Sequence, residues 1–184
     1  MIYIKQTNLK SIKLQNECVY MNLYNQEEID RINKTKETND KLEEFFNEKR
    51  QEWNKNVEPL FKVLGVDLSN PANSKEILNA QALALTYRQN INEQINYFLN
   101  RRSRETTKIK KLRQDKFVFY ATGFGIKTNL GEKAILIDAH VAENDRTMEL
   151  IESYIEFLRD TVRNLESLSY SIKNMIELMN YLGR

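Results

Sequence analysis

The sequence contains few of the residues that cross-link a chain, bind metals or form tight turns. One cysteine, Cys18, and one histidine, His140, occur among 184 residues. A disulfide framework, a clustered zinc site and a Cys/His catalytic dyad are therefore poorly supported. The low cysteine count is consistent with a protein of a reducing compartment. Only five glycines and two prolines are present, while charged residues make up 29%. This composition is typical of long helices and not of a large sheet protein.

Long apolar runs are missing as well. Residues 1–10 contain no apolar run of signal-peptide length, and no stretch approaches the roughly 18 to 20 apolar residues that span a bilayer. We therefore expect a soluble, cytoplasmic protein. The formal net charge is +2, so the chain is nearly balanced. The net charge therefore does not indicate an acidic partner, and only the distribution of charges along the chain can do so.

The N-terminal part of the chain has a mixed pattern. Residues 1–25 alternate loosely between apolar and polar side chains, which suggests two short strands or an extended arm. From Glu27 to Val57 the apolar spacing becomes helical, and Pro59 marks a break or a kink. The fold class predicted from the whole chain is mainly α-helical.

A cluster of turn-forming residues divides the chain in two. Residues 66–73 are rich in Asp, Ser, Asn and Pro and form the predicted linker between an N-terminal part, residues 1–65, and a helical region, residues 74–184. Ser74 is predicted to begin a helix that runs to about Lys116. The glycine-rich stretch that follows is expected to form a turn, a bulged hairpin or a strand-like connection.

Residues 132–182 contain neither glycine nor proline, so they form one coiled-coil-like helix or two helices broken near Asn144. Apolar residues alternate at spacings of three and four, with Ser169 as a polar exception. We expect this seam to mediate self-association into a homo-oligomer. Packing against the predicted helix of residues 74–116 in the same chain is the alternative, and both can hold together. The seam comprises Met148, Ile151, Ile155, Leu158, Val162, Leu165, Ile172, Ile176 and Met179.

The strongest local charge lies in residues 101–116. Eight cations along about 24 Å of helix attract polyanions through counterion release. Phe117 and Tyr120 follow and offer ring faces on which unpaired bases stack, so the segment is predicted to bind single-stranded nucleic acid. The alternative is a solvated basic face beside aromatic core residues. The cations are Arg101, Arg102, Arg104, Lys108, Lys110, Lys111, Arg113 and Lys116.

The remaining charged residues give little support for catalysis. Residues 138–166 carry a net negative charge, which either docks a basic partner surface or occupies ordinary outer positions of a coiled coil. His140 beside Asp138 is expected to be a surface or capping residue. No phosphate-loop or dinucleotide-binding pattern occurs around the glycines. We predict a non-enzymatic protein with no catalytic residue, metal site or cofactor.

Two phrases of the sequence resemble the UvsY-type recombination mediators of tailed phages. KLRQDKFVFYATG at residues 111–123 is close to the family pattern K-L-x-x-D-K-x-x-Y-Y-x-G, although Ala121 looks like an insertion. YSIKNMIE at residues 170–177 is close to F-x-I-K-N-x-I-E. The resemblance covers roughly residues 94–182, about half of the chain.

The resemblance implies a non-catalytic oligomer that binds single-stranded DNA. Such a protein displaces or remodels the single-strand-binding protein and helps to load a RecA-family recombinase. The resemblance also implies that the seam from Met148 to Met179 drives assembly of the oligomer. A hypothesis from another class is a coiled-coil scaffold or inhibitor that binds a host or virion protein and has no nucleic-acid role. The residues that the resemblance assigns to DNA are Lys110, Lys111, Arg113, Lys116, Phe117 and Tyr120.

Overall fold

A computed structural model of the protein describes residues 26–70, 73–123 and 129–182. All elements within these ranges are helical, so the predicted mainly α fold is confirmed. The strands or extended arm expected for residues 1–25 lie outside the described residues.

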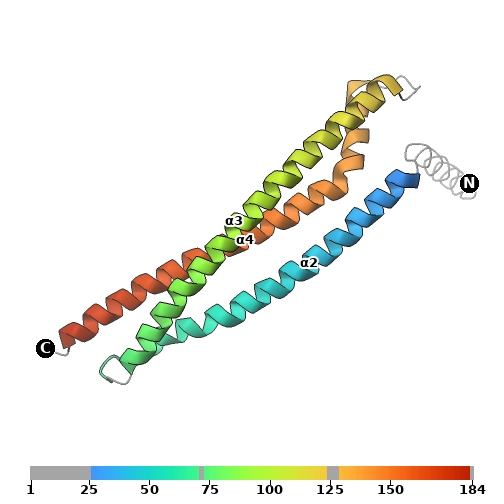
Figure 1. The fold of residues 1–184 in the computed structure, drawn as a ribbon. Helices are drawn as coiled ribbons and strands as arrows, with labels where there is room; N and C mark the ends of the chain where they lie inside the picture. The colour runs from blue at the N-terminus through green and yellow to red at the C-terminus, as the bar shows by residue number, and fades with distance from the viewer. Residues whose placement is uncertain (1–25, 71–72, 124–128, 183–184) are drawn as a thin grey trace, which may run out of the picture.

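Three long helices form an elongated bundle (Figure 1). They are α2, Gln26–Phe61, α3, Asn73–Val118, and α4, Leu130–Leu182. Successive helices reverse direction, so α3 runs antiparallel to both α2 and α4. At 1.5 Å per residue, the 53 residues of α4 extend for about 80 Å. A helix of this length presents a continuous apolar stripe, and α4 packs against both other helices.

The turn between α2 and α3 lies where the sequence predicts a linker. α2 continues past Pro59 to Phe61, and a short 3₁₀ helix, Lys62–Gly65, follows it. Asp67 Oδ1 then accepts hydrogen bonds from the backbone N–H and the hydroxyl of Ser69, at 2.9 and 2.8 Å. This turn joins two helices of one bundle, because the apolar stripe of α2 belongs to the same core as α3 and α4.

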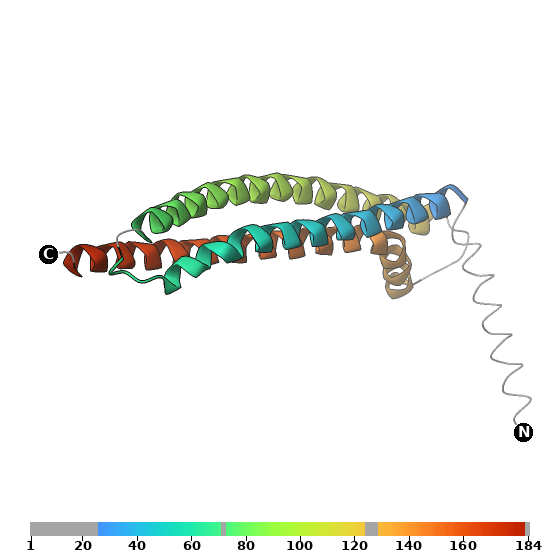
Figure 2. The ribbon, with the colours of Figure 1, turned by 90° about the horizontal axis from the view of Figure 1, so that it is seen from below.

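The connection between α3 and α4 differs from the expected hairpin or strand. The chain continues as a π-helix over Phe119–Gly123. In a π-helix, each carbonyl accepts a hydrogen bond from a residue one position further along than in an α-helix. Asn129 and Glu132 form a capping box at the start of α4, with reciprocal bonds of 2.9 and 2.8 Å. No break is found near Asn144, although the first turns of α4 bend away from the axis of its remainder (Figure 2).

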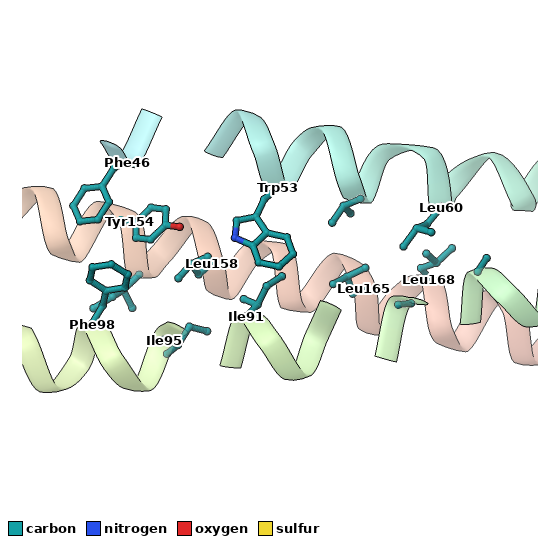
Figure 3. Packing of buried hydrophobic residues seen from close by; sticks show 14 of the residues in the cluster. Phe46, Trp53, Leu60, Ile91, Ile95, Phe98, Tyr154, Leu158, Leu165 and Leu168 are labelled. Atoms are coloured by element: carbon teal, nitrogen blue, oxygen red, sulfur yellow. The ribbon is translucent and has the colours of Figure 1, made fainter. Parts of the chain in front are cut away.

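One hydrophobic core runs along the bundle and takes side chains from all three helices (Figure 3). Aromatic rings fill its middle, where Phe46 of α2 stacks on Tyr154 of α4 with centroids 4.4 Å apart. Phe98 of α3 meets both rings edge to face, at 5.3 and 5.1 Å. This arrangement joins the three helices at one level.

The core also settles what covers the seam of α4. Met148, Val162, Ile176 and Met179 are half-buried. Packing inside the chain, the alternative considered above, therefore accounts for the stripe, and a second copy is not required to cover it. The fully buried members of the seam are Ile151, Ile155, Leu158, Leu165 and Ile172.

Two buried polar contacts define the register of the helices. Thr147 of α4 donates to Asn39 Oδ1 of α2 at 2.6 Å, and Asn39 Nδ2 donates to the Glu143 carbonyl at 2.7 Å. Sliding α2 by one turn would leave these groups buried without partners, which is costly. Ser169, the polar residue of the seam, instead bonds the Leu165 carbonyl of its own helix.

Candidate nucleic-acid interface

The eight cations of residues 101–116 divide into two sets. In the first set, Arg102 pairs with Glu152 at 3.1 Å, and Arg113 reaches Asp138 and Asp145 at 2.5 and 2.8 Å. All three carboxylates belong to α4, so the ion pairs cross between helices. The hydrogen bond that Arg113 donates to the Asp138 carboxylate raises the pKa of Arg113 above its ordinary value.

Lys116 belongs to the same set and lies deeper. It pairs with Glu28 of α2, and the two side chains are only 16% and 11% exposed. Glu28 also lies 2.7 Å from His140 Nδ1, and His140 Nε2 lies 2.5 Å from the Tyr120 hydroxyl. These four residues, the tip cluster, join the start of α2 to the α3–α4 turn.

Two residues of the tip cluster correct the sequence predictions. His140 is 2% exposed, so it is neither a surface nor a capping residue. Burial lowers the pKa of His140, the nearby Glu28 charge opposes this, and Lys116 and Arg31 lower it further. Tyr120 is also 2% exposed, so the ring predicted to stack on bases is not available to a strand. His140 follows Ile137 by three residues, and this helical spacing was the available signal for its burial.

The second set of cations is not paired with α2 or α4 in the described part of the chain. Its members are exposed except for Arg101, which is half-buried. Within the described ranges, Arg101, Arg104, Lys110 and Lys111 form no ion pair. Lys108 is 67% exposed and pairs only with Glu105 of its own helix, a type of contact that contributes little. Lys110 borders a separate shallow groove with Arg102 and Thr106.

Helical spacing gathers four of the five cations of the second set into one stripe, and Lys110 lies outside it. Positions three, four and seven apart share a face of a helix, so a single line extends for about 21 Å along α3. A shallow groove of about 330 Å³ runs along most of it. We call this surface the basic stripe, and it comprises Tyr97, Asn100, Arg101, Arg104, Lys108 and Lys111.

Aromatic side chains near the stripe differ from those that the sequence suggested. Tyr97 is 63% exposed and lies in the same groove as Arg101 and Arg104. Sequence reasoning missed Tyr97, although it precedes Arg101 by one helical turn. Phe117 is 47% exposed but lies at the far end of α3, in a separate groove beside α4. The stripe therefore offers one accessible ring next to its cations.

The acidic face predicted on α4 is largely engaged within the chain. Glu152 and Asp145 pair with the cations described above, and Glu166 pairs with Arg88 of α3 at 3.0 Å. These carboxylates hold α3 against α4 and are not an independent docking surface for a basic partner.

Comparison of the chain with protein-family models, with curated proteins and with solved structures found no match. Among the described helices, none combines the length and apolar character needed to cross a membrane. The same part of the chain contains no cluster of three or more His, Cys, Asp or Glu side chains placed to hold a metal ion.

Proposed function

We propose that the protein is a non-enzymatic recombination mediator that binds single-stranded DNA along the basic stripe and helps to load a RecA-family recombinase. The observation that carries the binding proposal is the line of four cations, of which Arg101 is half-buried and the other three are exposed, with the exposed Tyr97 at one end. Cations that follow a phosphate backbone beside an accessible ring suit binding without sequence preference. The mediator role rests on the resemblance of residues 94–182.

Electrostatics sets the scale of the proposed binding. Four phosphate contacts give a slope of about −2.8 for log affinity against log salt on a single strand. One stripe therefore binds weakly at high salt. Self-association, part of the same proposal, would present several stripes to one strand and raise avidity by orders of magnitude. Because the α4 seam is covered within the chain, assembly would use another surface.

The test is a titration of labelled oligothymidine at several salt concentrations, with solution mass recorded in the same buffers. Arg104→Glu with Lys111→Glu reverses two charges of the stripe and should weaken binding by more than about tenfold at low salt. The matched control reverses Lys55 and Lys62, which are exposed and have no ion pair in the described part of the chain. Unchanged affinity in the stripe variant would overturn the proposal, and equal affinity for duplex DNA would favour a generic basic helix.

A second candidate function is a scaffold or inhibitor that binds a host or virion protein. A groove of about 730 Å³ between the end of α3 and the start of α4 favours it, because exposed Phe117 and Val118 line this groove together with Ile137. Apolar grooves of this kind accept partner side chains. This function predicts a 1:1 complex with a protein and no affinity for oligothymidine.

A further inference from the structure

A groove between α2 and α3 continues from the end of the basic stripe. Its volume is about 580 Å³, within the range of small-ligand sites. Tyr97 lines both this groove and the groove of the basic stripe, so the two surfaces are continuous. We call it the amide groove, and its lining comprises Glu52, Trp53, Asn56, Tyr87, Asn90, Glu93, Gln94 and Tyr97.

Hydrogen bonds from two helices orient the Gln94 amide, which lines this groove. Gln94 Oε1 accepts from Trp53 Nε1 and from the Tyr154 hydroxyl, both at 3.3 Å. Burial raises the pKa of Tyr154, which keeps its phenol a proton donor. Since both bonds use the oxygen, the Nε2 donor group of Gln94 takes part in neither. Asn56 and Asn90 add two more amides with donors and acceptors.

The lining suits a nucleobase better than a phosphate. Amide groups hydrogen-bond the edges of unpaired bases, and Tyr97 and Tyr87 supply rings on which a base can stack. Glu52 and Glu93 would repel a phosphate but can accept from the amino groups of bases. Phosphates would instead lie on the cations of the adjoining stripe.

We infer that the amide groove holds an unpaired base of the strand whose phosphates lie on the basic stripe. This inference rests on the proposed function and adds that the protein contacts bases as well as the backbone. Binding would then distinguish a strand with exposed bases from a polyanion of equal charge. A duplex would be disfavoured, because its base edges and faces are already paired and stacked.

Trp53 makes the inference directly testable, because it is the only tryptophan of the chain and lines the groove. The wild-type protein would be titrated with oligothymidine and with an abasic oligomer of the same length, following tryptophan emission and anisotropy. Both oligomers should bind at low salt. Only oligothymidine should change the emission of Trp53, and it should bind about tenfold more tightly, the range of one stacked base.

A pair of variants gives the control. Asn90→Ala should reduce the advantage of oligothymidine and leave abasic affinity unchanged, while Asn96→Ala, an exposed change outside the groove, should alter neither. Equal affinities with no emission change would overturn the base site and leave the proposed function intact. An emission change with both oligomers, or an Asn90→Ala variant that behaves as the wild type, would also overturn it. Failure of both oligomers to bind would overturn the proposed function itself.

Discussion

The two sets of cations on α3 differ in role although they belong to the same segment of 16 residues, 101–116. Arg102, Arg113 and Lys116 point toward α4 or α2 and are neutralised there by carboxylates. Arg104 and Lys111 lie on the opposite face, are exposed, and form no ion pair with the described residues. Identical residue types therefore support the fold on one face and create a positive surface on the other.

The comparison teaches that a count of charges overestimates a binding surface. An ion-paired cation contributes little potential at a distance, since its carboxylate cancels it. Removing a cation that is paired between helices should change the stability of the fold. Removing an exposed, unpaired cation should instead change the interaction with a polyanion. The following predictions test this division, beginning with the largest expected effect.

Lys116→Met should lower the free energy of unfolding by about 2 kcal/mol, since it removes the closest cation from the largely buried Glu28 and leaves that carboxylate with the longer pair to Arg31 at 3.4 Å. Urea unfolding followed by circular dichroism would measure the loss. The double variant with Glu28→Gln should recover part of it. A single variant as stable as the wild type would show that Lys116 belongs with the solvent set.

Acid should destabilise the fold through the tip cluster, which contains His140. The pKa of His140 is lowered in the fold, so the unfolded chain binds more protons as pH falls below the ordinary histidine value of 6.5. The contribution of the neutral His140 to the free energy of unfolding should therefore be fully present above that value. It should decrease as the pH falls toward the lower pKa of His140 in the folded state. Unfolding curves across this range would show the slope, and His140→Asn should flatten it. An equal slope in the variant would assign the effect to carboxylates.

Arg113→Gln should cost about 1 kcal/mol, because it removes two partly exposed ion pairs between α3 and α4. Thermal unfolding would show a small decrease in Tm. The salt dependence of oligothymidine binding should stay close to that of the wild type. A large change in that slope would place Arg113 at the interface, as the sequence suggested.

Arg104→Gln with Lys111→Gln should change stability by less than about 0.5 kcal/mol, since neither side chain has an ion pair to lose. On the proposed function, the same variant should reduce the salt slope by about 1.4. Stability and binding would thus respond oppositely in the two sets. A destabilised variant with normal binding would reverse the assignment.

Much of the helical architecture could be predicted from local pattern. The helix expected from Ser74 to about Lys116 is observed as Asn73–Val118, and the one expected over residues 132–182 is observed as Leu130–Leu182. These boundaries follow from apolar spacing, caps and the positions of glycine, which act within a few residues of the chain.

The candidate site could be predicted only in part. The sequence indicated a basic segment, and four of its eight cations lie on the basic stripe. Tyr120 was assigned to the surface and is buried, because His140 lies opposite it. Tyr97 was missed, because its exposure depends on where α2 packs. Neither outcome follows from neighbouring residues alone.

The sequence by itself determined that this chain forms long amphipathic helices, approximately where α3 and α4 begin and end, and that α3 carries a dense run of cations. Tertiary structure alone decided which cations are neutralised, which aromatic rings are accessible, and that α2 and α3 cover the seam of α4. The physical reason is range. Helix formation depends on residues three and four apart, whereas ion pairing and burial depend on the register between helices, set by contacts such as Asn39 with Thr147 across more than 100 positions.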